Sequence, residues 1–323
     1  MERRDKLIGG VDLTNCVVAE IGALCNPILK KSEADIRYVD YADAKTLRAH
    51  YANNPLIDPE RIVETDAIWG KDTLLAALKQ PVDLIVASHV VEHVPDLIVW
   101  FDELHLALAP TGQVRLAIPD RRFTFDFLRR ETSLSDVLAV HLYSPRVPQP
   151  HQILDYYLNA TPVDVAAAWR MEVSEQTLQR PDNYQAAMSM AKDALTNGTY
   201  HDAHCWVFTP QSFATLLEAL GRLGLIHFAC DHFHDTEYGS IEFFVRMKPS
   251  TNVDEIAASW ARMAASVRVH SPVAVSASDR AEIDSPPQIH LEKPIQLGRM
   301  EGLKLKLSAA HKAFNTLLQK ITP

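Results

Sequence analysis

The chain lacks several features that mark whole classes of protein. Its four cysteines form no C-x-x-C pair, and a disulfide framework is not expected in a chain of 323 residues. No segment approaches the roughly 20 consecutive apolar residues of a membrane span. No apolar run follows the charged start of the chain, so no signal peptide is expected. These absences predict a cytoplasmic protein without a transmembrane segment.

The charge pattern narrows the choice of partner. The net charge is −9, and no long basic run occurs. A nucleic-acid-binding face needs clustered Lys and Arg, so nucleic acid is not an expected partner. Apolar residues make up 47% and charged residues 23%, which is ordinary for a globular protein with a substantial core. The length predicts one large domain, or a domain with an appendage.

Short apolar segments alternate with helical ones along the first two thirds of the chain. This alternation favours a parallel sheet with helices on both faces. A turn at Pro110, Thr111 and Gly112 is expected before the fifth strand, and a loop holding His232 and His234 between the last two. Those last two strands should form a hairpin at the edge of the sheet. The predicted strands are residues 16–21, 36–41, 61–68, 83–87, 113–120, 225–230 and 240–247.

The remaining segments suggest additions to this sheet. Residues 121–200 predict a helical insertion after strand five, and the core domain is expected to span 1–249. Residues 250–323 predict a linker and a helical tail, including a helix over 253–267. An apolar stripe at heptad-like spacing needs a partner surface: the protein's own core, a second subunit of a homo-oligomer, or an anionic membrane. That stripe consists of Leu303, Leu307, Ala310, Phe314, Leu317 and Ile321.

Polar residues stand at the predicted carboxyl ends of the strands, where open α/β sheets bind ligands. Glu20 and Gly22 close the first strand, Asp40 the second and Asp66 the third. Ser88 follows the fourth strand. A carboxylate in the place of Asp40 can accept both hydroxyl protons of a ribose, and Asp66 can meet an adenine amino group.

In these segments the chain resembles the class I S-adenosylmethionine-dependent methyltransferases. The resemblance covers residues 15–248 and rests on AEIG, YVDY, ETDA, ASHVVEHV, LAPTGQVRLAIPD and EFFV. It implies a Rossmann-like, seven-stranded, mostly parallel sheet and a methyltransferase activity. It also implies S-adenosyl-L-methionine as cofactor, bound by Glu20, Gly22, Asp40, Asp66 and Ser88.

The first loop departs from the family pattern. The family usually reads E-x-G-x-G-x-G, whereas this chain reads EIGALCNP and keeps only Gly22. Side chains at Ala23, Leu24 and Cys25 are expected to crowd a close approach of the backbone to the cofactor. Either the loop follows another path, or cofactor binding is weakened or lost. In the second case the chain would be a non-catalytic binding or scaffold protein.

A cluster of histidines follows the fourth strand. His89, Glu92 and His93 form an H-x-x-E-H run, and His204 precedes a helix capped by Thr209. This resembles a metal-dependent subgroup that includes the ubiquinone-pathway O-methyltransferases and the small-RNA 3′-terminal 2′-O-methyltransferases. The resemblance implies one divalent metal ion held by His89, Glu92, His93 and His204. His89 replaces a Glu of the subgroup, which favours zinc or another imidazole-preferring metal. Without a metal, His93 or His204 is the candidate general base.

The segment DRRFTFD follows the fifth strand, where this fold usually places the substrate. Arg121 and Arg122 are candidates to grip a phosphate or carboxylate, and Asp126 to orient hydroxyls. Surface salt bridges and core packing are the alternative. Together with EIGALCNPIL and HVVEHVPD, the segment resembles methyltransferase-domain proteins of bacterial surface-glycan assembly. That resemblance implies O-methylation of a sugar or glycan hydroxyl, with a small molecule or glycan as acceptor.

Overall fold

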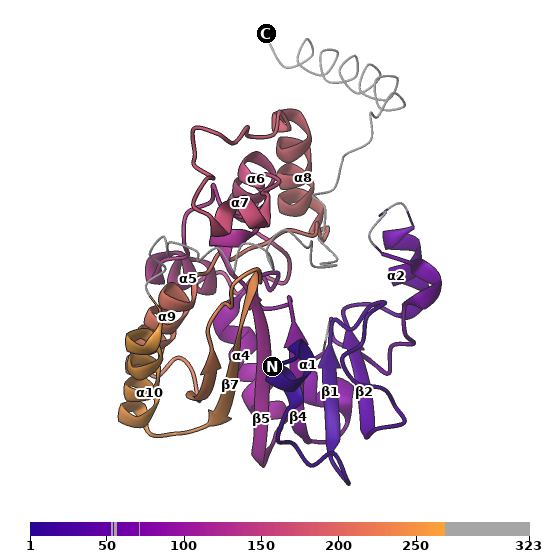
Figure 1. The fold of residues 1–323 in the computed structure, drawn as a ribbon. Coiled ribbons are helices and arrows are strands. Elements are labelled where there is room, and N and C mark those ends of the chain that lie inside the picture. The colour runs from indigo at the N-terminus through magenta and orange to yellow at the C-terminus, as the bar shows by residue number, and fades with distance from the viewer. Residues whose placement is uncertain (53, 55–56, 71, 269–323) are drawn as a thin grey trace. The chain divides into compact units, whose positions relative to one another are not determined.

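The structure, a computed structural model, describes residues 1–52, 54, 57–70 and 72–268 and is built on one sheet (Figure 1). The strand order is β3-β2-β1-β4-β5-β7-β6; the first five strands in sequence are parallel, and β7 runs antiparallel to β5 and β6. The predicted class I methyltransferase fold is confirmed. The strands are β1 (Val17–Ile21), β2 (Asp35–Asp40), β3 (Ala67–Ile68), β4 (Val82–Ser88), β5 (Leu108–Pro119), β6 (Phe228–His234) and β7 (Glu242–Pro249).

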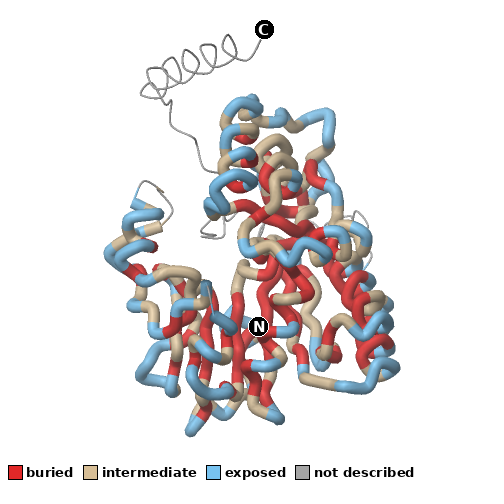
Figure 2. The backbone as a smooth tube through the Cα atoms, turned by 180° about the vertical axis from the view of Figure 1, so that it is seen from behind, coloured by how far each residue is buried: buried red, intermediate tan, exposed pale blue. Residues whose placement is uncertain are grey.

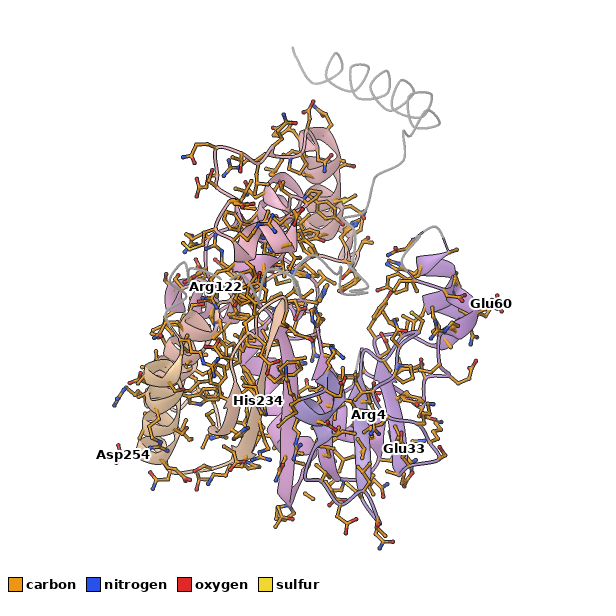
Figure 3. All side chains as sticks on the ribbon, viewed as in Figure 1. Arg4, Glu33, Glu60, Arg122, His234 and Asp254 are labelled. Carbon is orange, nitrogen blue, oxygen red and sulfur yellow. The ribbon has the colours of Figure 1, made fainter. Side chains whose placement is uncertain are left out.

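Helices pack on both faces of the sheet. One face is covered by α3, α4, α9 and α10, and the buried strands stand out along it in Figure 2. The other face is covered at its centre by α1, which Arg4 ties to Glu33 by an ion pair (Figure 3). The helices are α1 (Arg3–Ile8), α2 (Ala44–Tyr51), α3 (Leu74–Leu78), α4 (Leu97–Ala107), α5 (Leu134–His141), α6 (Pro150–Asn159), α7 (Val165–Trp169), α8 (Tyr184–Asn197), α9 (Pro210–Arg222) and α10 (Val253–Ser266), with 3-10 turns at Pro59–Arg61 and Arg121–Phe123.

Helices α9 and α10 begin as the sequence predicts. The Thr209 hydroxyl accepts from Ser212 N at 3.1 Å, which satisfies one of the unpaired N–H groups at the start of α9. In α10, Trp260 is fully buried and donates from its indole N–H to Phe228 O at 2.8 Å. The packed core therefore continues past residue 249, where the sequence suggested its end, as far as α10.

The third strand is shorter than predicted, and Asp66 therefore lies outside it. Val63 N donates to Leu24 O at 3.0 Å, so this segment pairs with the loop after β1 and joins the sheet only at Ala67. Asp66 N donates to Tyr38 O, in the middle of β2. Asp66 thus precedes β3, and its predicted place at the carboxyl end of that strand is wrong.

Two predicted loops lie within strands. The expected turn at Pro110, Thr111 and Gly112 belongs to β5, whose pairing with β4 is irregular between Val82 and Leu84. The loop expected to hold His232 and His234 is also wrong, because both residues lie in β6. Polar residues two apart in a strand face the same side, so a polar run here is a strand with one polar face.

The insertion after β5 is helical, as predicted. Helices α6 and α8 pack around Ile153, Ala191 and Ala194. Trp169 in α7 donates from its indole N–H to Ser240 O at 2.9 Å, which ties the insertion to the segment before β7. The heptad-like stripe from Leu303 to Ile321, and with it the predicted self-association, falls outside the described residues. None of the described helices is long and apolar enough to cross a membrane.

Candidate active site

A buried carboxylate stands at the turn after β4. The Glu92 side chain is fully buried, and neither of its oxygens has a hydrogen bond to a described residue. Its Oε1 lies 3.7 Å from His89 Nδ1 and 3.9 Å from His93 Nε2. Its backbone oxygen accepts from Cys205 N at 2.6 Å, which brings the segment around residue 204 alongside the turn. A buried carboxylate without a hydrogen bond is costly, so this position favours a cation or another proton donor.

Two histidines face Glu92, and each is oriented by its own carboxylate. His93 Nδ1 lies 2.8 Å from Asp202 Oδ1, and His204 Nδ1 lies 2.6 Å from Asp126 Oδ2. The two rings meet edge to face with their centroids 4.5 Å apart. In both rings a carboxylate at Nδ1 fixes the orientation of the imidazole, and Nε2 of His93 lies on the side of Glu92.

Glu92, His93 and His204 form a group that fits a metal ion. One ligand atom of each side chain can be chosen so that all three lie within 4.8 Å of one another. Two imidazoles and one carboxylate are a donor set found in catalytic zinc sites, which keep a further position open for water or substrate. His89, the fourth predicted ligand, does not belong to this group.

Charged neighbours fix the two supporting carboxylates. Arg129 is 1% exposed and donates to Asp126 at 2.7 Å and to the backbone oxygen of His204 at 2.7 Å. Burial alone would raise the pKa of Asp126, but His204 and Arg129 outweigh it and hold the pKa well below its ordinary value. The pKa of Asp202 is likewise held low against burial, by His93 and His204. Both carboxylates are therefore ionised and can keep the rings in place.

His89 lies between Glu92 and a second buried carboxylate, Glu242. It has a positive φ of 54°, and its Nε2 lies 2.9 Å from Glu242 Oε2. Arg3 from α1 donates to Glu242 at 2.6 Å and to the Ser88 hydroxyl at 2.6 Å. Burial opposes ionisation of Glu242, yet His89 and Arg3 lower its pKa to about 2. These contacts connect the end of β4 with the first residue of β7.

The loop after β1 has two residues with positive φ, Gly22 and Leu24. Gly22 has a φ of +71°, and a Cβ there would come within 2.8 Å of Val90 Cγ2. Leu24 has a φ of 42°, which is unusual for a residue with a side chain. Ala23 and Cys25 are buried within core clusters, so their side chains point into the protein. That Ala23, Leu24 and Cys25 crowd the approach of the backbone to the cofactor stays a prediction.

The ends of β1 and β2 carry carboxylates with different surroundings. Glu20 is buried and accepts from Ile28 N at 2.6 Å and Leu29 N at 3.0 Å, so it holds the loop after β1 in shape. Asp40 accepts from Tyr41 N at 2.8 Å through Oδ1, and its Oδ2 has no hydrogen bond to a described residue. Burial raises the pKa of Asp40 to about 6. Asp66 is paired with Lys31 at 2.5 Å.

The comparisons with known proteins agree with this fold. A family model described as a methyltransferase domain matches residues 21–222. The chain belongs to the methyltransferase domain family. It is an S-adenosylmethionine-dependent methyltransferase. No curated protein matches the chain.

Solved structures similar to the methyltransferase are distant in sequence. The structure of a DhpI–SAH complex is 13% identical with a TM-score of 0.35, covering 74% of this chain and 79% of that one. The CcbJ methyltransferase from Streptomyces caelestis is 11% identical with a TM-score of 0.39, covering 77% and 89%. An S-adenosylmethionine-dependent methyltransferase from Mesorhizobium loti is 12% identical with a TM-score of 0.35, covering 73% and 92%. The family assignment rests on the family model.

The residues at the strand ends of the methyltransferase fit its cofactor unequally. Asp40 combines burial with a carboxylate oxygen not used by the protein, which suits a pair of ribose hydroxyls. The missing Cβ of Gly22 lets the loop pack closely against Val90, whose Cγ2 a Cβ would approach to 2.8 Å. Glu20 and Asp66 bind groups of the protein itself, and Ser88 accepts from Arg3. The hydrogen bonds of these three side chains therefore hold neighbouring parts of the protein in place. Cofactor contacts of Glu20, Asp66 and Ser88 stay predictions.

The segment predicted to bind substrate has partners within the protein. Arg122 is bound to the fully buried Asp120 through two guanidinium nitrogens, and Arg121 donates to Phe127 O. Asp126 is shared between His204 and Arg129 and orients the histidine. Substrate contacts of Arg121, Arg122 and Asp126 stay predictions.

Several residues of the site were missed in the sequence. Asp202 lies 109 positions from His93, and Arg3 lies 239 positions from Glu242. No periodic pattern marks such contacts. One signal was available for Glu242: it is a charged residue at the start of the otherwise apolar EFFV.

Proposed function

We propose that the methyltransferase transfers a methyl group to a hydroxyl oxygen, and that Glu92, His93 and His204 activate that hydroxyl. The observation that carries this proposal is the Glu92 carboxylate, which is buried without a hydrogen bond and faces two histidines held by ionised aspartates. A hydroxyl is a poor nucleophile until its proton is taken or its oxygen is bound to a metal.

The three side chains act together around one divalent ion, with zinc as the favoured metal. Two imidazole nitrogens and a carboxylate oxygen match its preferred ligands. A bound ion would supply Lewis acidity that lowers the pKa of an oxygen ligand. Asp126 and Asp202 bind Nδ1 of the two rings and so fix the orientation of each imidazole. The positive charge of the ion also compensates the Glu92 carboxylate.

Asp40 and Gly22 hold the methyl donor. The cofactor supplies the methyl group, which the protein must align with the acceptor oxygen. Asp40 accepts hydrogen bonds from the ribose hydroxyls, and Gly22 lets the loop pass close to the cofactor. Tyr200 stacks on Tyr41 with ring centroids 5.1 Å apart. This contact links the end of β2 to the segment that carries Asp202.

The acceptor is a sugar or glycan hydroxyl. This choice rests on the resemblance of IPDRRFTFD and HVVEHVPD to surface-glycan proteins. The surroundings of His204 are compatible with it, because the partly exposed rings of Phe125 and Tyr156 lie 4.8 and 5.5 Å from the imidazole. Aromatic faces with nearby carboxylates suit a ligand that is both hydroxylated and partly apolar.

Transfer of labelled methyl groups tests the proposal. The protein is incubated with methyl-labelled S-adenosylmethionine and a panel of monosaccharides, nucleotide sugars and glycans, and label in each acceptor is measured. We expect label on a sugar oxygen that is lost in Glu92→Gln and His204→Gln. His201→Gln is the matched control, because His201 lies on the same segment but binds Asp193. Methyl transfer to nitrogen or carbon acceptors alone would contradict the proposal.

A further inference from the structure

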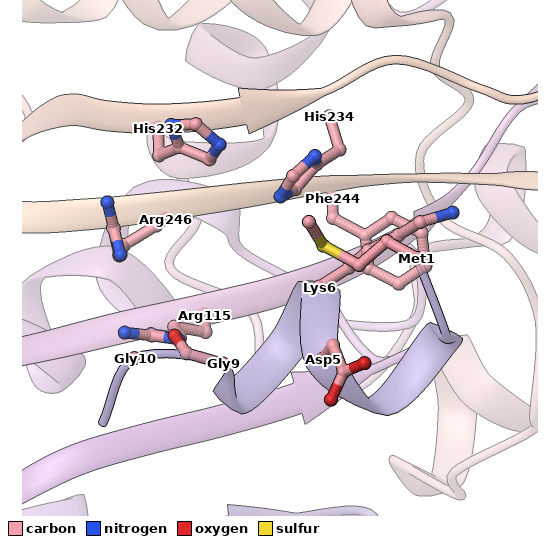
Figure 4. A pocket seen from close by; sticks show the side chains of 10 residues that line it. All are labelled: Met1, Asp5, Lys6, Gly9, Gly10, Arg115, His232, His234, Phe244 and Arg246. Atoms are coloured by element: carbon pink, nitrogen blue, oxygen red, sulfur yellow. The ribbon is translucent and has the colours of Figure 1, made fainter. Parts of the chain in front are cut away.

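A cavity of about 410 Å³ lies apart from the candidate active site, between α1 and the strands β5, β7 and β6 (Figure 4). Its wall is a row of directly paired residues: Arg115 of β5 lies opposite Arg246 of β7, which lies opposite His232 of β6. In the next row Phe244 lies opposite His234. Lys6 of α1 completes the lining, with its ammonium 5.2 Å from the centre of the Phe244 ring.

This arrangement is electrostatically unfavourable without a ligand. Like charges directly opposite each other on neighbouring strands repel and destabilise a sheet. Arg246 has a carboxylate partner in Asp231 at 2.5 Å, and Lys6 has one in Glu237 at 2.6 Å. Asp5 is the acidic residue among those that line the cavity. Arg115 forms no ion pair with a carboxylate among the described residues, so its charge is the least compensated of the three cations.

Arg115 is the buried cation among the residues that line the cavity. It is 3% exposed, and its guanidinium donates to three neutral oxygens: the backbone oxygens of Leu7 and Gly9 and the side chain of Gln113. Its Nε is buried without a hydrogen-bond partner among the described residues. Burial and the nearby Arg246 lower the pKa of Arg115 to about 10. A buried cation with a donor left over is expected to bind an anion.

His234, the second histidine that lines the cavity, also has positively charged neighbours. His232 and His234 lie in contact, with ring centroids 4.5 Å apart. Burial, His232 and Lys6 together lower the pKa of His234, as expected where positive charges gather. The opposite face of these strands is apolar core, with Val245 and Met247 buried. The sequence therefore concentrates its cations on one face of β5, β7 and β6.

We propose that this cavity binds the phosphate group of a small molecule through Arg115, Arg246 and His232. Guanidinium groups match phosphate oxygens in charge and in donor geometry. The volume exceeds that of a phosphate ion, and Phe244 and Met1 add an apolar side, so the ligand carries an organic body next to its phosphate. The site is separate from the proposed methyl-transfer site and does not depend on it.

Titration of the full-length protein with inorganic phosphate tests the assignment. Binding is followed by isothermal calorimetry and by the ring proton signals of His232 and His234 in NMR spectra, at constant ionic strength set with sodium chloride. We expect saturable binding that Arg246→Gln weakens roughly tenfold or more, the loss of one charged hydrogen bond. His232→Gln should weaken it as well.

Lys248→Gln is the matched control, because Lys248 lies on the same strand, pairs with Glu255 and does not line the cavity. It should bind phosphate as the unchanged protein does. Circular dichroism and thermal unfolding confirm that each variant folds. Glucose 1-phosphate should bind more tightly than inorganic phosphate, and glucose should not bind. Absence of saturable phosphate binding, or equal weakening in Arg246→Gln and Lys248→Gln, would overturn the proposal.

Discussion

His204 and Asp126 form a buried hydrogen-bonded pair, with Nδ1 of the imidazole 2.6 Å from Oδ2 of the carboxylate. Arg129 holds the same carboxylate from its other side and also binds the backbone oxygen of His204. The pair joins the helical insertion to the segment that precedes α9. Orientation of the proposed base or metal ligand therefore depends on Asp126 and, through it, on Arg129.

Asp126→Asn should lower the turnover number while leaving the affinity for S-adenosylhomocysteine unchanged. The substitution removes the charge that fixes the ring of His204, an effect worth about ten- to a hundredfold at metal-bound histidines. It also leaves Arg129 with less compensation, so the free energy of unfolding should fall by about 3 kcal/mol. Steady-state kinetics, calorimetry and urea unfolding measure the three quantities.

Asp155→Asn is the control for that variant. Asp155 also pairs with Arg129, at 2.9 Å, but it is partly exposed and does not contact His204. Turnover by Asp155→Asn should stay close to that of the unchanged protein. Equal loss of turnover in both variants would mean that Arg129, and not the orientation of His204, matters for activity.

Glu92→Gln should stabilise the protein after treatment with a chelator. Both oxygens of Glu92 are buried without hydrogen bonds, so removing the charge removes a desolvation cost. The expected gain in free energy of unfolding is about 1–3 kcal/mol. Urea unfolding in the presence of EDTA measures it. A loss of stability on this substitution would show that the carboxylate is already compensated inside the protein.

Asp40 should make stability depend on pH. Its pKa rises from an ordinary 3.8 to about 6 on burial, so between these pH values the folded protein keeps a proton that the unfolded chain has released. The free energy of unfolding should therefore fall by about 2 kcal/mol as the pH rises from about 4 to about 6, and by about 3 kcal/mol over the whole range from below about pH 3 to above about pH 7, other groups being equal. Asp40→Asn should remove this part of the pH dependence, as measured by urea unfolding across that range.

Asp40 should also make cofactor affinity depend on pH. Ribose hydroxyls donate to the ionised carboxylate, so S-adenosylhomocysteine should bind more tightly as the pH rises through about 6. At pH 8, Asp40→Ala should lose about 1.5–3 kcal/mol of binding free energy, the usual range for a hydrogen bond to a charge. Unchanged affinity in that variant would remove Asp40 from the cofactor site.

Gly22→Ala should lower both stability and cofactor affinity. The added Cβ would meet Val90 Cγ2 at 2.8 Å, and the residue has a φ of +71°. We expect a loss of about 1–3 kcal/mol in the free energy of unfolding, from backbone strain and crowding. Gly198→Ala separates the two causes, because its φ is +65° and nothing lies within 4 Å of the added carbon. A loss no larger than that of Gly198→Ala would show that crowding at Val90 is not important.

The sequence predicted the sheet well because strand and helix patterns are local. The cap at Thr209 and the strand at residues 83–87 follow from neighbours a few positions apart. Residues 231–234 were mistaken for a loop because His232 and His234 are polar. They form the polar face of β6, and the apolar residue between them packs against the core. An edge strand with one polar face and a loop look alike until the partner strand is known.

The site was predictable only in part, since its contacts join distant segments. Glu92, His93 and His204 were named from spacing and resemblance, and the structure brings these three together. It also directs His89 to Glu242 at the start of β7, two strands away from β4, a proximity that depends on the sheet order. Similarly, Asp66 lies before β3 and not at its carboxyl end, because Val63 pairs with Leu24 instead of extending β3. No pattern within one segment contains that information.

Elemental analysis of the protein purified without chelators tests the central claim most directly. We expect one zinc or similar divalent ion per chain, with stoichiometry lost in Glu92→Gln and His204→Gln and retained in His201→Gln. Methyl transfer should fall when EDTA removes the ion and return when zinc is added. Protein that contains no stoichiometric metal, and that transfers methyl groups equally well with EDTA present, would contradict the account and leave His93 or His204 as a metal-free base.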